Sequence, residues 1–138
     1  MKIALLTLVI CALMFSELIA QLGSTKTEIA QNHGWNFESG VTTDEFKVNY
    51  IYYDKQMQSN SGGNYQSRYV FYFNEKGYCN QQKIMEPISE INAWIKYFNS
   101  DMVRIDKMKW KDYSTVIVYH VESKEEIVIV TSFYEGED

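Results

Sequence analysis

The sequence is poor in residues that cross-link or stiffen a chain. Only two cysteines, Cys11 and Cys79, occur in 138 residues. Cys11 belongs to an N-terminal apolar run that we expect to be removed, so the remaining chain has one thiol and no internal disulfide. The single proline, Pro87, marks no linker between domains. A hydrophobic core must therefore hold the fold, and the length suits one domain.

A surplus of positive charge is also lacking. The chain has 13 basic and 18 acidic residues, for a net charge of −5. Removing residues 1–20 takes away one residue of each sign and leaves this balance unchanged. Binding to nucleic acid or anionic lipid without sequence preference depends on excess Lys and Arg. We therefore expect no nucleic-acid partner.

Residues that catalyse reactions or bind metals are scarce. The chain has two histidines, no Cys-x-x-Cys or His-x-x-x-His motif, and no Gly-rich phosphate loop followed by Lys-Ser/Thr. Cys79 and His120 are the one Cys–His pair worth considering for nucleophilic catalysis, and nothing in the sequence brings them together. A small, half-buried strand residue is the favoured interpretation of Cys79. We predict a protein that is not an enzyme and has no metal or cofactor.

The N-terminus has the layout of a secretory signal. Lys2 gives a positive start, residues 3–15 are almost wholly apolar, and the segment ends at Ala20. The apolar run is shorter than the roughly 20 residues that span a bilayer. We therefore predict a signal peptide over 1–20, a single domain over 21–138, and export to the periplasm or beyond the cell.

A lipid anchor on Cys11 is the less favoured alternative. A bacterial lipobox has a small residue directly before the cysteine, whereas Ile10 stands there. Cys11 also lies in the middle of the apolar run, where a small hydrophobic residue is ordinary. The predicted mature chain therefore begins near Gln21.

Two segments have helical patterns. "STKTEIAQNHG" predicts a helix over 26–33, because Thr25 and Glu28 have capping-box spacing and Gly34 suits a helix stop. "EPISEINAWIKYFNS" predicts a second helix with Pro87 at its first position. Its apolar residues form one stripe: Ile88, Ile91, Trp94, Ile95 and Phe98.

Elsewhere the apolar period changes to two, which predicts strands. "EFKVNYIYYD" and "DMVRIDKMKW" are expected strands, the second a weaker one, and "SRYVFYFNEKGYCNQQKIM" reads as strand, turn, strand. "STVIVYHVESKEEIVIVTSFY" predicts a hairpin rich in β-branched residues. The polar stretch 54–67 is expected to be a long hairpin connection.

These elements predict an α+β fold in the order α-β-β-β-α-β-β-β. One antiparallel sheet of five or six strands would carry both helices on one face. On the opposite face, Arg68, Asn49, Lys107 and His120 would keep parts in contact with water. Val70 and Tyr72, if they lie there, would make that face unusually aromatic.

The segment "LGSTKTEIAQNHG" resembles the start of a repeat found in small exported bacterial domains. Its matching residues are Gly23, Thr25, Glu28, Ile29 and Gly34. The repeat is that of the β-lactamase-inhibitor-protein fold and of the small lipoprotein of the outer-membrane assembly machine. Trp35 stands where those proteins usually have Pro, and the lipobox is poor. The resemblance implies an exported α+β domain with a binding or assembly role, and it transfers no functional residues.

Aromatic residues are the unusual feature that remains, with 11 tyrosines in the chain. Tyrosine combines contact area with a polar tip, which suits binding surfaces, although filling a sheet–helix core is the commoner use. The predicted binding surface is the polar loop and its neighbours: Tyr53, Asn64, Tyr65, Trp110 and Tyr113. We predict an exported binding domain of the bacterial cell envelope, with a protein or other envelope component as partner. The alternative is a small apolar-ligand-binding protein with a pocket between sheet and helices.

Overall fold

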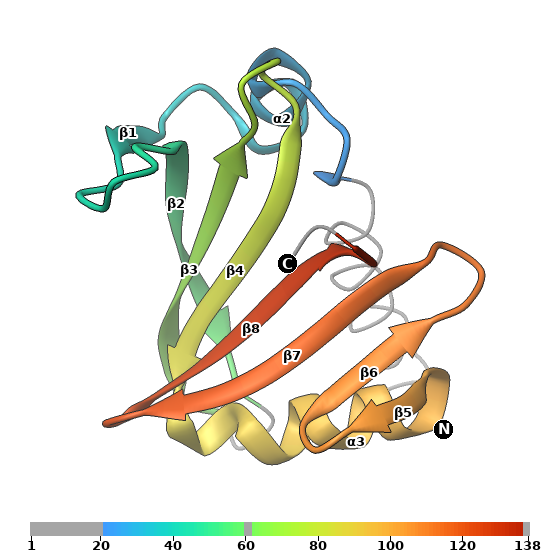
Figure 1. Cartoon of the computed structure of the whole chain (residues 1–138). Helices are drawn as coiled ribbons and strands as arrows, with labels where there is room; N and C mark the ends of the chain where they lie inside the picture. The colour runs from blue at the N-terminus through green and yellow to red at the C-terminus, as the bar shows by residue number, and fades with distance from the viewer. Residues whose placement is uncertain (1–20, 60–61, 137–138) are drawn as a thin grey trace.

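A computed structural model of the chain describes residues 21–59 and 62–136 (Figure 1). Both predicted helices and all the expected strands fall within these ranges. The signal peptide predicted for residues 1–20 lies outside the described residues, and so does the alternative anchor at Cys11.

The described residues form one α+β antiparallel-sheet fold in which a helix and four strands occur twice. The elements are α2 (Lys26–His33), β1 (Glu38–Val41), β2 (Asn49–Gln58), β3 (Asn64–Phe73), β4 (Cys79–Pro87), the 3-10 turn η1 (Ile88–Glu90), α3 (Ile91–Asp101), β5 (Val103–Asp106), β6 (Lys109–Asp112), β7 (Ile117–Lys124) and β8 (Ile127–Tyr134). The predicted sheet of five or six strands in α-β-β-β-α-β-β-β order is wrong, because each half contains a fourth strand.

All eight strands belong to one sheet, in the order β1-β2-β3-β4-β8-β7-β6-β5. Each half is an antiparallel meander, and the halves join along β4 and β8, where pairing runs from Gln81↔Phe133 to Pro87↔Ile127. Figure 1 shows β2, β3 and β4 running steeply while β8, β7 and β6 cross at a slant, so the sheet is strongly twisted.

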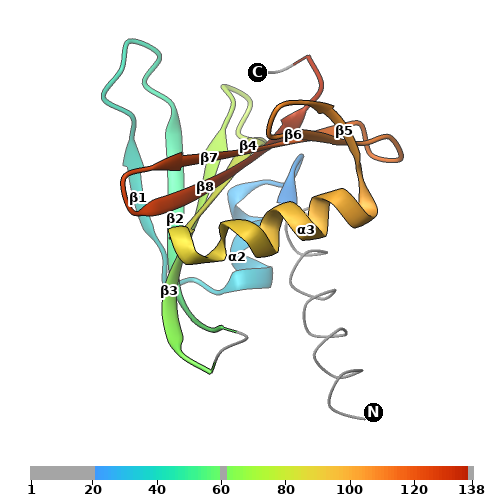
Figure 2. The ribbon, with the colours of Figure 1, turned by 90° about the horizontal axis from the view of Figure 1, so that it is seen from below.

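Both helices pack on the same face of the sheet (Figure 2), and Figure 1 shows them near its opposite ends, α2 at the top and α3 at the bottom. Ile29 of α2 and Phe98 of α3 are fully buried and belong to one hydrophobic cluster with Ile51 and Val121 of the sheet. The single cluster explains why the two halves form one domain. No helix within residues 21–59 and 62–136 has the length and apolar composition needed to cross a membrane.

The N-terminus of α2 has the predicted capping box. The Glu28 amide donates to Thr25 Oγ1 at 3.2 Å, and the Thr25 amide donates to Glu28 Oε1 at 3.2 Å. Gly34 ends the helix with a φ of +101°, a conformation that suits glycine. The predicted helix over 26–33 is confirmed.

The second helix begins later than predicted. Pro87 is the last residue of β4 and precedes the 3-10 turn, so its predicted place as the first helical residue is wrong. The apolar stripe nevertheless faces the sheet, since Trp94 and Phe98 are buried. The Phe98 ring lies 5.4 Å from Trp110 and 5.1 Å from Tyr119, centroid to centroid.

Of two predicted hairpin connections, the structure confirms one and contradicts the other. The predicted "NEKG" turn joins β3 to β4: the Gly77 amide donates to the Asn74 carbonyl at 2.9 Å, and Gly77 has a φ of +84°. The expected long connection over 54–67 is wrong, because β2 continues to Gln58 and β3 begins at Asn64. Strand pairing reaches from Tyr50↔Tyr72 to Gln58↔Asn64.

Candidate functional site

The face of the sheet opposite the helices carries a cluster of aromatic and charged side chains. Side chains alternate along a strand, so residues next to buried Ile51, Phe71 and Ile84 point to this second face. We call this cluster the tyrosine face; it consists of Tyr50, Tyr52, Asp54, Arg68, Tyr72 and Lys83. Its members come from β2, β3 and β4.

The tyrosine rings lie close enough to interact with one another. Tyr50 and Tyr52 stack with their centroids 6.4 Å apart. Tyr50 also meets Tyr72, its cross-strand partner, at 5.9 Å. Aromatic pairs at these separations stabilise a sheet and hold the rings in defined orientations. The three phenol groups are therefore presented as an ordered set.

Cations cover two of these rings. The Arg68 guanidinium carbon lies 4.3 Å from the Tyr52 centroid, and Lys83 Nζ lies 5.6 Å from that of Tyr72. Arg68 also donates to both carboxylate oxygens of Asp54, at 2.8 and 3.0 Å. The hydrogen bond from Arg68 lowers the pKa of Asp54, so the pair stays charged.

Long side chains cover the smaller apolar residues beneath them. Val70 is only 5% exposed, although no helix of the described chain packs on this face. Its register partners are Tyr52 on β2 and Lys83 on β4, whose apolar parts cover it. Val70 and Tyr72 thus lie on the uncovered face, a place that the sequence had left open.

Two residues of the predicted binding surface belong to the core. Tyr53 is buried on the helix-facing side of β2, and its hydroxyl donates to the Gly34 carbonyl at 2.8 Å. Trp110 is 0% exposed, and its Nε1 donates to Asn99 Oδ1 at 2.9 Å. Both rings fill the space between sheet and helices, so neither offers a surface to a partner.

The other three predicted residues lie apart from one another. Asn64 and Tyr65 line a pocket of about 360 Å³ beside Glu90 at the start of α3. Tyr113 is 61% exposed in the turn between β6 and β7, where Lys111 Nζ lies 4.3 Å from its ring centroid. The structure does not bring the five predicted residues together as one surface.

A buried carboxyl group, Glu86, lies near the Tyr65 pocket. Glu86 is 5% exposed at the end of β4, and Trp94 Nε1 donates to its Oε1 at 2.6 Å. Burial raises the pKa of Glu86 above its ordinary value. Burial together with the charges of Glu86 and Glu90 also raises the pKa of Tyr65. Glu86 thereby ties α3 to the sheet through a polar contact.

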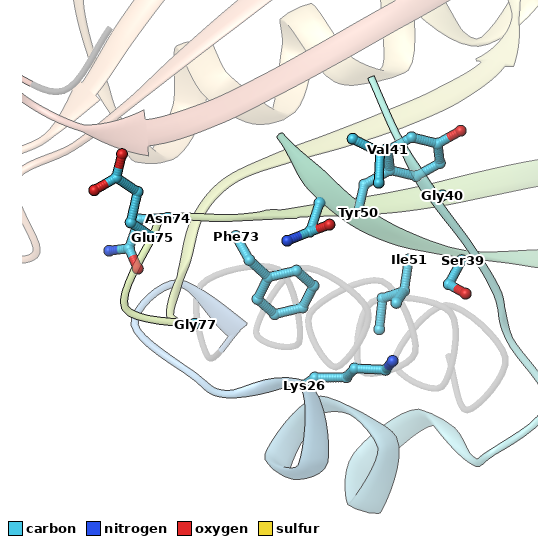
Figure 3. Close-up of a pocket in the computed structure, with 11 residues that line it drawn as sticks. Lys26, Ser39, Gly40, Val41, Tyr50, Ile51, Phe73, Asn74, Glu75 and Gly77 are labelled. Carbon is cyan, nitrogen blue, oxygen red and sulfur yellow. The ribbon is translucent and has the colours of Figure 1, made fainter. Parts of the chain in front are cut away.

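A second pocket, of about 420 Å³, opens where β2 and β3 separate (Figure 3). The β2–β3 ladder ends at Tyr50↔Tyr72, and Asn49 pairs with Val41 of β1 instead. Val41 and Tyr50 line the pocket together with the largely buried Ile51 and Phe73, and Lys26 reaches it from α2. We call this the strand-end pocket.

The candidate catalytic pair from the sequence is not assembled. Cys79 is buried in the core cluster, whereas His120 alternates with core residues Tyr119 and Val121 and so points to the other face. Burial raises the pKa of the Cys79 thiol to about 12, which keeps it protonated at neutral pH. Among the described residues, no group of three or more His, Cys, Asp or Glu side chains is arranged to hold a metal ion.

Comparison with known proteins adds no relative. No family model, curated protein or solved structure matches the chain. The resemblance of the segment around Thr25 and Glu28 to the inhibitor-protein repeat therefore stays a prediction.

Proposed function

We propose that the protein is an exported, non-enzymatic binding domain of the bacterial cell envelope. Export is supported by the signal-like pattern of residues 1–20. The binding role is supported by the tyrosine face, whose rings and cations form an ordered array on the uncovered side of the sheet. That array is the observation that carries the proposal.

The partner that best fits the tyrosine face is a protein surface with acidic side chains. Lys83 makes no ion pair with any described residue, and its strand neighbours Gln81 and Met85 are uncharged. The protein as a whole is acidic, so Lys83 is a local positive charge that attracts carboxylates. The neighbouring tyrosines add contact area and hydroxyl groups that can donate hydrogen bonds to the partner. Tyrosine and arginine are also enriched where binding energy concentrates in interfaces.

The proposal is tested by capture from an envelope extract on immobilised residues 21–138. Wild type is compared with Tyr72→Ala, with the charge reversal Lys83→Glu, and with Tyr113→Ala as a matched control in a distant turn. We expect one set of proteins to be lost with Tyr72→Ala and Lys83→Glu but kept with Tyr113→Ala. An identical captured set for all four chains, each shown to be folded by circular dichroism, would refute the tyrosine face as the binding surface.

A second candidate function, binding of a small apolar ligand, is favoured by one observation. The strand-end pocket is lined by Lys26 of α2 and by strands of the sheet, and its apolar lining includes Val41, Tyr50 and Phe73. Its volume of about 420 Å³ lies within the usual range of small-molecule sites, roughly 300–1,000 Å³. The chemistry of that pocket decides which ligand it would take.

A further inference from the structure

We infer that the strand-end pocket binds a carboxylate group joined to an apolar body. This inference rests on the second candidate function, the binding of a small ligand between α2 and the sheet. It adds the chemical class of that ligand, which follows from how charge and apolar surface are distributed around the pocket.

The apolar part of the site combines Val41 and Tyr50 with the edges of two core residues, Ile51 and Phe73. Ile51 and Phe73 are both largely buried, and Figure 3 shows their side chains directed toward the space above Lys26. The β2–β3 ladder ends at Tyr50↔Tyr72, so Phe73 lies beyond the last paired residues of the two strands. The exposed Val41 and the half-buried Tyr50 line the same space, so an apolar group seated here is partly removed from water.

The charged part of the site is Lys26, in the first turn of α2. Lys26 lines the pocket, and its Nζ lies 5.0 Å from the centroid of the Phe37 ring, a contact that restricts the side chain. Lys26 makes no ion pair with any residue of the described ranges. The one acidic residue of the lining, Glu75, lies beyond Phe73 with its carboxylate turned away in Figure 3. An anionic head therefore fits beside Lys26.

Neutral polar groups complete the rim. Ser39 and Asn49 also line the pocket. The Asn74 side chain is already engaged, since its Oδ1 accepts from the amides of Lys76 and Tyr78 at 3.0 Å each. The lining thus combines one cation, two neutral polar side chains and an apolar part, which suits an amphipathic anion. We take the anionic group to be a carboxylate, which occurs in many small metabolites and at peptide C-termini.

The test is an NMR titration of ¹⁵N-labelled residues 21–138 with 3-phenylpropionate, 3-phenylpropanol and 3-phenylpropylamine. We expect saturable shifts of the amides of Ile51 and Phe73, with 3-phenylpropionate binding tightest. Lys26→Gln should weaken that binding about three- to tenfold, as loss of a partly solvated charge pair does, while Lys76→Gln in the adjacent turn leaves it unchanged. Higher salt should weaken the wild-type interaction in the same direction.

The outcomes separate the ligand class from the pocket. Equal binding of all three compounds, with shifts at Ile51 and Phe73, would overturn the carboxylate inference and keep the small-ligand function. Absence of shifts at the pocket with every compound would overturn both. A further arm compares N-acetyl-glycyl-phenylalanine with 3-phenylpropionate, with the C-terminal amide of the peptide as the uncharged control. Tighter binding of the peptide acid than of 3-phenylpropionate supports a peptide end as the source, and weaker binding supports a free carboxylate.

Discussion

At the scale of single residues, Glu86 couples the fold to pH. Burial raises the pKa of Glu86 above its ordinary value, so the folded chain favours the neutral carboxyl. The stability contributed by this group is complete below the pKa of the unfolded chain, about 4.3. It is lost as pH rises through the raised pKa of the folded chain. Stability from this residue therefore decreases with increasing pH.

Glu86→Gln is expected to remove that pH dependence, because glutamine keeps an oxygen for Trp94 Nε1 without a charge. We measure the free energy of unfolding in urea from pH 4 to 8. The free energy of unfolding of Glu86→Gln should increase relative to that of wild type as the pH rises. Glu86→Ala removes the acceptor of the Trp94 Nε1 hydrogen bond and should cost about 1–3 kcal/mol. Glu122→Gln, on an exposed part of β7, is the control; the same pH slope for both Gln variants would contradict the assignment.

Gly40 is required by the ring that packs against it. A Cβ at this position would lie 2.5 Å from Tyr50 Oη and 2.6 Å from its Cζ. Gly40→Ala must displace Tyr50 from its cross-strand position, and we expect a loss of about 1–3 kcal/mol in the free energy of unfolding. Gly63→Ala, whose Cβ would meet its nearest neighbour at 3.8 Å, should be nearly neutral. Equal costs in denaturant unfolding would contradict this reason.

Residues of the candidate sites were predictable only in part. The spacing of Tyr50 and Tyr52 gives one shared face, and the structure confirms it. The core positions of Tyr53 and Trp110 could not be read from the sequence, because a tyrosine or tryptophan with one polar atom suits core and surface alike. No sequence motif marks Lys26 or Glu86 as a site residue. Lys26 contacts Phe37 only after the chain has turned back beyond α2, and Glu86 contacts Trp94 across the junction between β4 and α3.

At the scale of elements, α2 is too short to be stable alone. It has eight residues, and isolated helices of that length are not populated in water. Its capping box and its docking through Ile29 and Ala30 must therefore provide its stability. The same dependence makes its cap a sensitive position.

Thr25→Ala is expected to cost about 1 kcal/mol, because it removes the acceptor of the Glu28 amide. Thr27→Ala, exposed within the same helix, is the matched control and should change stability little. Both effects are measured as free energies of unfolding in urea. A Thr25→Ala chain as stable as the Thr27→Ala chain would show that the cap contributes nothing.

The elements also show where sequence patterns were insufficient. Long strands with β-branched residues, such as β7 and β8, were predictable from their alternation. β1, β5 and β6 have four residues each, too few for a periodic pattern. The β5–β6 hairpin turns at Lys107 and Met108, and Met108 has a φ of +57° without the Asn-Gly or Asp-Gly pair that usually signals such a turn.

At the scale of the whole molecule, the two meanders share one core across the β4–β8 junction. Ile84 pairs with Val130 there, and both are buried in the same cluster. A common core predicts that the halves unfold together. Tryptophan fluorescence and far-ultraviolet circular dichroism should therefore give coincident urea transitions.

Ile84→Ala tests that junction, and we expect it to cost about 2–5 kcal/mol, because it leaves a cavity between the halves. The transition should stay single and move to lower urea. Ile127→Ala is the control: Ile127 ends the same β4–β8 ladder but is 38% exposed, so its loss should be much smaller. Two separated transitions in either chain would contradict a shared core.

The two outermost strands, β1 and β5, have a consequence for how this protein meets other molecules. Each offers only four residues of free backbone, and charged Glu38, Arg104 and Asp106 lie along them. A borrowed ninth strand would find little main chain to pair with, and charges at a sheet border discourage such templating. We therefore expect a partner to contact side chains of this molecule rather than to add a strand to its sheet. For the same reason, concentrated solutions should resist fibril growth.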